Sequence, residues 1–340
     1  MDSGPLIDVR VARWAAVTVA RRPKSTVADA AALRASVAED LPRIDAATRS
    51  WSGLGRPDGR LDVRVVGRMG WVAANLAGLP SLFEPLRERI TRMPGAAQVL
   101  GAQFGALFGL LSSRVLGQYV LPLAEGSIGQ LVVVGPNLVE LREQHGEIAD
   151  DMRRAVLLHE ATHGLQFEHA PWLAPHLRML IHRYLADVTF DRDVVVRLAA
   201  SLPDTVRRVR ASGSIEPVMD VVLTESQRDV LDTAQGLMSL LEGHGSAAMF
   251  DAGDVLVADA NAVREAFSAR RNDTSARILN AVAGLELKRQ QYDRGEIFVR
   301  AVVEQHGMST VNRAFDGAMN LPGRDELDDP DGWARRVLAA

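Results

Sequence analysis

One stretch in the middle of the chain, residues 150–167, constrains the fold more than any other. Five of its residues recur at helical spacing and share one stripe: Met152, Val156, His159, His163 and Phe167. Asp150 and Asp151 suit a helix N-terminus, where carboxylates meet unpaired backbone N–H groups. Pro171 closes the helix. We therefore expect a long helix that carries two histidines toward the interior, where unpaired imidazoles are costly.

The spacing of those histidines favours a metal site. His159 and His163 lie four residues apart, so a helix stacks them one turn apart on the same face. Two imidazole nitrogens placed in this way can bind one ion. The chain has no cysteine, which excludes disulfides, thiolate ligands and cysteine nucleophiles. Any metal must therefore be held by histidines and carboxylates, and Zn²⁺ is the expected ion.

Glu160 follows the first histidine directly and is rotated from it by about 100° around the helix. Its carboxylate therefore misses the metal but can reach a water molecule bound to it. A metal ion lowers the pKa of such a water toward about 7. The pattern predicts that Glu160 is a general base, which takes a proton from the water and passes it to the leaving group.

A third ligand must come from elsewhere in the chain. Glu242 lies in an apolar, helix-compatible run, where a carboxylate is costly unless it is paired or bound to a metal, and it is our preferred ligand. His169 is the main alternative, because it lies six residues after His163, at the position where metzincins carry their third histidine. The metzincin pattern also requires a glycine at position 166, which lets the chain turn sharply, and this chain has Gln166 there. His244 is a further alternative, as a ligand, a hydrogen-bond donor behind the ligands, or a transition-state stabiliser.

A second polar cluster spans residues 284–295 and contains Tyr292. Tyr292 is a candidate donor to an oxyanion. The competing interpretation of this cluster is a solvated helix face held by structural ion pairs.

Charge and hydropathy limit the partners. The formal net charge is −4, so the chain has no basic field for nucleic acid. Only two lysines occur, which fits a GC-rich bacterial genome. The most apolar stretch, residues 101–123, is interrupted by Arg114, glutamines, glycines and serines, and favours a buried helix pair or hairpin over a membrane span. We expect a cytoplasmic protein, and nothing in the sequence specifies its oligomeric state.

The rest of the sequence indicates a mainly α protein. Helical patterns cover residues 8–20, 25–49, 68–76 and 82–93, with Thr26 as a candidate N-cap. Gly101, Gly105 and Gly109 recur every four residues and predict close helix packing. Leu131–Val134 is the best strand candidate, a small β element before the histidine helix. We expect one α-rich domain over residues 1–340, with residues 1–125 as an alternative N-terminal helical subdomain.

Several motifs occur in a fixed order that resembles one known family. They are residues 101–105, 115–119, 134–137, 159–163, 171–173, 241–244, 284–288, 291–292 and 326–330, the last before Trp333. In this order they are similar to the zincin-like metallopeptidases of type 2, also described as hydrolases or coenzyme F420 biosynthesis-associated proteins. The resemblance covers roughly residues 5–338. It implies a mostly helical zincin-like fold, and it carries His159, Glu160 and His163 over directly.

The same resemblance places Glu242 and His244 in the second signature of the family. One departure follows that signature: the family usually has an acid where this chain has Phe250, and the next acid is Asp251. If the usual acid orients a ligand, Phe250 changes how the site is tuned. The F420 label describes genomic association, and nothing in this sequence resembles a deazaflavin site.

Three functions fit these observations. The first is a zinc-dependent hydrolase, most specifically a peptidase that cleaves a peptide amide. The second is a metal-bearing scaffold or binding protein without proteolysis. The third is an amidase or deacylase acting on a small amide. A peptidase commonly presents an edge strand to its extended substrate, and Leu131–Val134 is the candidate for that strand.

Overall fold

Helices make up most of the chain, as the sequence predicts. The computed structural model describes residues 5–124, 126–187, 225–253, 256–272 and 286–339, without the side chains of 271–272 and 286–293. The α-helices are α1 (Val9–Val19), α2 (Val27–Ser52), α3 (Arg68–Leu82), α4 (Arg87–Arg92), α5 (Ala96–Leu111), α6 (Gly135–His145), α7 (Ala149–His169), α8 (Leu173–Ala186), α11 (Glu225–Asp251), α12 (Ala260–Asn272), α14 (Glu286–His306), α15 (Met308–Asn312) and α16 (Pro330–Ala339). Short 3₁₀ turns cover Glu84–Leu86, Gly146–Ile148, Arg313–Asp316, Ala318–Asn320 and Asp325–Asp328.

The start of α2 shows how local chemistry sets a boundary. The Thr26 side chain accepts a hydrogen bond from the backbone N–H of Asp29, at 3.2 Å. The Asp29 carboxylate accepts one from the backbone N–H of Thr26, at 2.7 Å. This reciprocal pair satisfies two N–H groups that an uncapped helix leaves unpaired. The predicted N-cap at Thr26 is confirmed.

A small sheet of three strands lies at the centre: β1 (Val63–Val66), β2 (Gly117–Val120) and β3 (Gln130–Val134). β3 confirms the predicted strand. It is the middle strand of the order β1-β3-β2, parallel to β1 and antiparallel to β2. β1 and β2 were not predicted, because their four residues each give too short a pattern to separate from a loop.

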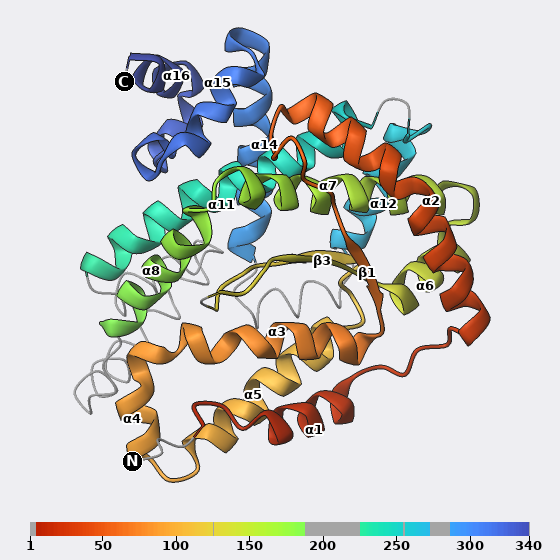
Figure 1. Cartoon of the computed structure of the whole chain (residues 1–340), viewed down its shortest axis with the longest axis vertical. Helices are drawn as coiled ribbons and strands as arrows, with labels where there is room; N and C mark the ends of the chain where they lie inside the picture. The colour runs from red at the N-terminus through yellow and green to blue at the C-terminus, as the bar shows by residue number, and fades with distance from the viewer. Residues whose placement is uncertain (1–4, 125, 188–224, 254–255, 273–285, 340) are drawn as a thin grey trace, which may run out of the picture.

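The position of β3 explains its run of apolar residues. Leu131 and Val133 pack into a core cluster with residues of α2 and α7. Val132 and Val134 point the other way, into a cluster with residues of α1 and α3. Side chains alternate between the faces of a strand, so a central strand covered on both faces is apolar throughout. In Figure 1 the sheet lies between α7 on one side and α3 with the α1–α5 pair on the other.

The repeated glycines of α5 face α1. Gly101, Gly105 and Gly109 are buried, and a side chain on any of them would collide with the backbone of α1 at Asp8, Ala12 or Ala16. The two helices therefore run parallel at close distance. This contact confirms that the four-residue glycine repeat serves helix packing.

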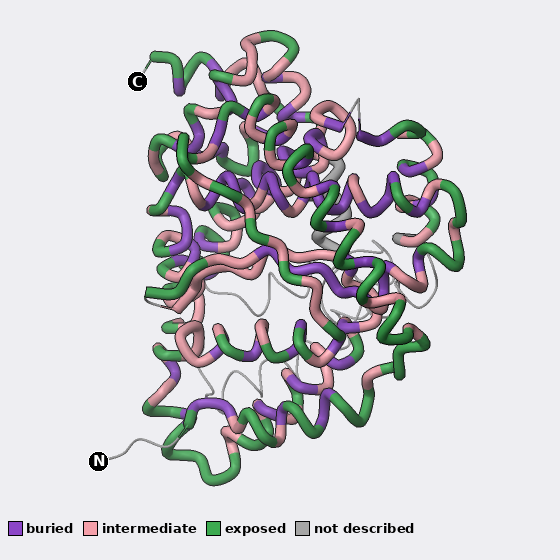
Figure 2. Tube along the Cα trace, turned by 45° about the vertical axis from the view of Figure 1, so that its right-hand side comes forward, coloured by how far each residue is buried: buried purple, intermediate pink, exposed green. Residues whose placement is uncertain are grey.

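Buried residues concentrate in the middle of the molecule, while the outer turns of the peripheral helices are exposed (Figure 2). α7 occupies that middle region and packs against α2, β2 and α11, and α14 packs against α11. None of the helices in the described ranges is both long enough and apolar enough to span a bilayer. The single domain over residues 1–340, with residues 1–125 as its alternative subdomain, stays a prediction.

Candidate metal centre

Two helices bring the predicted ligands together. α7 carries His159 and His163, and their Nε2 atoms lie 3.1 Å apart. α11 carries Glu242, whose Oε2 atom lies 3.3 Å from Nε2 of His159 and 3.6 Å from Nε2 of His163. In the described part of the chain, these three residues form the group of histidines and acids that could hold one ion. Residues about 80 positions apart in the sequence thus meet at one point.

The three atoms fit a zinc ion. Ligands at about 2.0–2.1 Å from a tetrahedral Zn²⁺ stand about 3.3 Å from one another, and the distances here are 3.1, 3.3 and 3.6 Å. The Oε2 atom of Glu242 is buried and has no hydrogen-bond partner among the described residues. A carboxylate oxygen in that position needs a cation or a donor. The group therefore has the atom types, the spacing and the burial of a zinc site.

Two glycines of α11 make this approach possible. Gly245 lies one helical turn after Glu242, and a Cβ atom there would be 2.9 Å from the His159 ring. Gly243 lies against the backbone of Gly295 in α14, where a side chain would collide. α14 thus packs closely on the back of α11, and α11 leaves room for an imidazole on its front.

The electrostatics of the metal-free group show the same preference for a positive charge. Burial alone would lower the pKa of His163, but the Glu242 carboxylate, assisted by Glu160 and Gln166, raises it to about 9. Burial alone would raise the pKa of Glu242, but the two imidazoles hold it well below its usual range. A proton therefore occupies the group when no metal is bound, and metal binding must displace it.

Glu160 points toward the sheet. Its Oε2 atom accepts a hydrogen bond of 2.6 Å from the backbone N–H of Tyr119 in β2. Gly117, two residues earlier in β2, allows the strand to lie close to α7, because a Cβ atom there would be 2.8 Å from Val156 and 3.0 Å from Glu160. The strand therefore fixes one oxygen of the predicted general base and leaves Oε1 for other chemistry.

His244 lies behind the ligands, outside the group of three. Its ring is fully buried and stacks on Trp51, with ring centroids 5.0 Å apart. Its Nδ1 atom lies 3.1 Å from Nε2 of Gln166, whose Oε1 atom lies 2.9 Å from Nδ1 of His163. Burial, and to a smaller extent the charge of His163, lowers the pKa of His244 to about 3, so this imidazole is neutral. His244 was predicted from the sequence, whereas no function was predicted for Gln166 or Trp51.

Other residues singled out from the sequence lie elsewhere. His169 is exposed at the end of α7 and does not belong to the group of three. Tyr292 is in α14, one turn before Gly295, and its side chain lies outside the described residues. At the family departure, Arg264 stacks on the Phe250 ring at 3.7 Å, and Asp251 pairs with Arg300 at 2.8 Å. Neither residue 250 nor residue 251 joins the group that could hold an ion.

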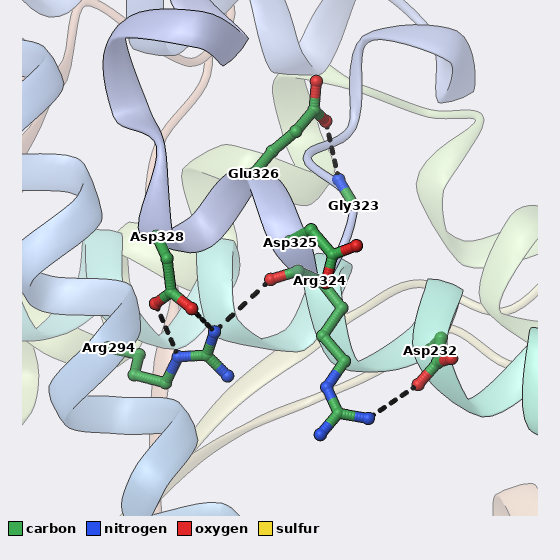
Figure 3. Close-up of a pocket in the computed structure, with 7 residues that line it drawn as sticks. All are labelled: Asp232, Arg294, Gly323, Arg324, Asp325, Glu326 and Asp328. Carbon is green, nitrogen blue, oxygen red and sulfur yellow. Dashed lines mark hydrogen bonds and ion pairs between the residues drawn. The ribbon is translucent and has the colours of Figure 1, made fainter.

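A hollow on the surface between α11, α14 and the segment before α16 is a separate feature (Figure 3). Its charges pair with one another: Arg294 with Asp328 at 2.5 Å, and Arg324 with Asp232 at 3.3 Å. Asp232 precedes Glu242 by ten residues, which corresponds to about 15 Å along the helix. We assign this hollow to surface ion pairing.

A helix with two histidines one turn apart, a glutamate between them and a third ligand from a later helix defines the class of zincin-like metal sites. The sequence matches the zincin-like metallopeptidase family over residues 7–334. The chain therefore belongs to this family. It is also similar to a crystal structure described as a putative hydrolase with a novel fold from Chloroflexus aurantiacus, at 30% identity and a TM-score of 0.73. That likeness covers 97% of this chain and 98% of the other. Among curated proteins, no significant match is found.

Proposed function

We propose that this protein is a zinc-dependent hydrolase, and most specifically a peptidase. The observation that carries the proposal is the convergence of His159, His163 and Glu242 on one point, with Glu160 beside it. His159, His163 and Glu242 would hold Zn²⁺ through Nε2, Nε2 and Oε2. When bound, such an ion polarises a carbonyl group and acidifies water.

Glu160 acts as the general base. Because the Tyr119 backbone N–H engages Oε2, the Oε1 atom takes the proton of the attacking water and later delivers it to the leaving amine nitrogen. The strand holds this carboxylate in one orientation before substrate arrives. Preorganisation of this kind lowers the cost of reaching the transition state. Tyr292 remains our candidate donor to the oxyanion, and its test is a variant at that position.

The substrate strand is expected on β2. β3, the strand named from the sequence, has partners on both edges, so it cannot accept an extended peptide. β2 is an edge strand of the sheet. Just before it, the backbone carbonyl oxygen of Leu116 accepts a hydrogen bond from the backbone N–H of Val134 in β3, at 2.9 Å. Alternate residues of an antiparallel strand point their backbone groups to opposite edges. Gly117 and Tyr119 therefore direct their backbone groups to the outer edge of β2, beside Glu160. Glu160 takes the Tyr119 N–H, so an extended peptide would pair with the remaining backbone groups of this edge by strand addition.

The decisive experiment is Glu160→Gln in zinc-loaded protein. We expect turnover of a reactive peptide to fall by at least roughly 10²–10⁴-fold, while zinc content stays at one per chain. A glutamine keeps an acceptor for the Tyr119 N–H but cannot take a proton. Loss of zinc in this variant would show that Glu160 holds the metal group together and does not act as the base.

A matched control exists on the same helix. Glu168 accepts hydrogen bonds from the backbone N–H of Arg56 and from Arg49, both at 3.0 Å, and lies outside the group of three. Glu168→Gln should leave turnover within a few-fold of the natural protein. An equal loss of activity in both variants would point to a general disturbance of α7.

The burial of the group favours small or extended substrates over folded ones. The side chains of His159, His163 and Glu242 are only 9%, 12% and 12% exposed. A panel should therefore contain unstructured peptides and small acyl amides. Cleavage of the small amides alone would identify an amidase. Cleavage of neither by protein with one zinc per chain would identify a metal-bearing scaffold, and elemental analysis of protein purified without added metal would identify the native ion.

A further inference from the structure

Gln166 is a polar residue in an apolar part of α7. It is fully buried, and its side-chain amide meets three groups. Its Nε2 atom lies 3.2 Å from the backbone carbonyl oxygen of Leu241 and 3.1 Å from Nδ1 of His244. Its Oε1 atom lies 2.9 Å from Nδ1 of His163. One amide therefore connects a proposed metal ligand of α7 with two residues of α11.

These contacts determine which way the amide points. The backbone carbonyl of Leu241 can only accept a hydrogen bond, so the Gln166 nitrogen, which carries the two hydrogens, must face it. The Gln166 oxygen then faces His163 and can only accept. The Nδ1 atom of His163 must therefore be the donor and carry a proton. In the neutral ring, the Nε2 lone pair is then left to face His159 and Glu242.

The second hydrogen of the Gln166 amide settles the state of His244 in the same way. This hydrogen points at Nδ1 of His244, which must accept it. The remaining proton of the neutral His244 ring then belongs on Nε2, an atom with no hydrogen-bond partner among the described residues. Trp51 stacks on the face of this ring. His244 is therefore an acceptor that holds the Gln166 amide.

We propose that Gln166 is a positioning residue that fixes His163 as the Nδ1–H tautomer, and that His244 acts on the metal group through Gln166. This inference rests on the proposed metal site. A metal-binding histidine generally donates its other ring N–H to a carboxylate, a backbone carbonyl or a water. Here a neutral side-chain amide takes that place and ties α7 to α11. Loss of such a partner typically weakens metal binding by about 10- to 100-fold.

The test measures zinc affinity by competition with a chromophoric chelator in the full chain. Gln166→Leu, of similar volume, should raise the zinc Kd by about 10- to 100-fold. His244→Phe, which keeps a ring on Trp51, should raise it less, because Leu241 still holds the amide. The double variant should match Gln166→Leu alone, since His244 acts through Gln166. The proposal would be overturned if the changes in zinc Kd of the two single variants added up in the double variant, or if Gln166→Leu bound zinc as tightly as the unmutated protein.

The matched control is Thr162→Val. Thr162 is also fully buried on α7, next to His163, and its hydroxyl donates to the backbone carbonyl of Leu158 at 2.8 Å. This variant loses a buried hydrogen bond without touching the hydrogen bonds that join His163, Gln166 and His244. Its zinc affinity should therefore stay within a few-fold of that of the unmutated protein. A loss as large as that of Gln166→Leu would mean that any buried polar change on α7 weakens the site.

Histidine ring ¹⁵N NMR of the unmutated protein reads the tautomers directly. We expect His163 to be protonated on Nδ1 and His244 on Nε2. The opposite assignment for His163 would overturn the proposal even if a Gln166 variant fails to fold. Without metal the His163 ring is protonated on Nε2 as well. In that state only the Nδ1 proton is diagnostic, and it should still be present because the hydrogen bond from His163 to Gln166 does not require zinc. If the unmutated protein binds no zinc, the proposed function fails, while the hydrogen bonds of Gln166 to His163 and His244 can still be tested. If zinc binds normally and these hydrogen bonds are absent, only this inference fails.

Discussion

The two halves of α7 both carry polar groups into the interior, but they do so in opposite ways. In the N-terminal half, Arg153 and Arg154 meet Asp40 of α2, at 2.7 and 3.2 Å. Asp40 is only 4% exposed. In the C-terminal half, His159 and His163 meet Glu242 of α11 at similar distances. Distance and burial alone do not distinguish the two clusters.

The chemistry of the atoms that face one another does distinguish them. Guanidinium groups only donate and carboxylates only accept, so cationic donors meet anionic acceptors around Asp40 without an added ion. Only Nε of Arg153 is left there without a hydrogen-bond partner among the described residues. Two neutral imidazoles and a carboxylate instead direct lone pairs at one point. That cluster is completed by a cation, whether a proton or a metal ion. A cluster of buried polar groups thus indicates a binding site when its own donors and acceptors do not satisfy one another.

The largest expected effect tests the cluster around Asp40. Asp40→Ala leaves two arginines without their shared buried partner, although Asp150 and Asp151 still pair with them. Breaking a buried pair costs at most about 3–5 kcal/mol. The free energy of unfolding, measured by urea denaturation, should fall by up to that amount, equally with zinc and with a chelator. A loss confined to the zinc-loaded protein would show that the two clusters are coupled.

An exposed ion pair supplies the control for this variant. Glu88 and Arg92 of α4 pair at 3.2 Å, with side chains 83% and 78% exposed. Solvent-exposed pairs contribute about 0–1 kcal/mol. Glu88→Ala should therefore barely change the free energy of unfolding, and a large change would undermine the assignment of the Asp40 effect to burial.

The second effect in size tests the incomplete cluster. Glu242→Gln replaces one ligand without changing the volume of the side chain. Structural zinc sites bind with about 10–16 kcal/mol over four ligands, so losing one ligand should weaken zinc binding by roughly a hundred- to a thousandfold. Isothermal titration calorimetry measures this change. The free energy of unfolding in chelator should fall as well, because the Glu242 carboxylate there stabilises the protonated, buried His163.

If Glu242→Gln binds zinc as tightly as the unmutated protein, Glu242 is not a ligand, and the third ligand must be one of the alternatives. His169→Gln should be neutral in the same experiment, because His169 is exposed and outside the group of three. Weakened binding in His169→Gln with normal binding in Glu242→Gln would reverse our assignment.

The two clusters also show which features of the fold and of the site can be predicted from the sequence. The helical stripe of residues 150–167 predicts α7 and the meeting of His159 with His163, because both depend on local spacing. Glu242 could be selected because an apolar run rarely contains an unpaired carboxylate. Its role as a ligand stays a prediction, although the structure brings it to the two histidines.

Gln166 carried a signal that sequence analysis did not use. It lies three residues after His163, and residues three apart share a helix face. A buried amide on that face is a natural partner for a ligand. Tyr119 and Trp51 carried no comparable signal, because their contacts with Glu160 and His244 join residues far apart in the sequence. Those contacts depend on how β2 packs on α7 and how α2 packs on α11, which local pattern does not determine.

The smallest effect tests how tightly α11 must approach α7. Gly245→Ala would place a Cβ atom 2.9 Å from the His159 ring, so the ring must shift by a few tenths of an ångström. Overpacking of this kind costs about 1–3 kcal/mol. Because the ring is a proposed ligand, we expect zinc affinity to fall by roughly tenfold, with a smaller change in the free energy of unfolding in chelator.

Gly78→Ala in α3 is the matched control, because a Cβ atom there meets nothing within 4 Å. Replacing a helical glycine in open space stabilises a protein by roughly 0.5–1 kcal/mol through backbone entropy. Gly78→Ala should therefore raise the free energy of unfolding and leave zinc binding unchanged. Unchanged zinc binding in Gly245→Ala as well would show that the His159 ring has free space around it. In that case the close approach of α11 would serve only packing, as the glycines of α5 do, and the incomplete cluster would tolerate more movement than its geometry indicates.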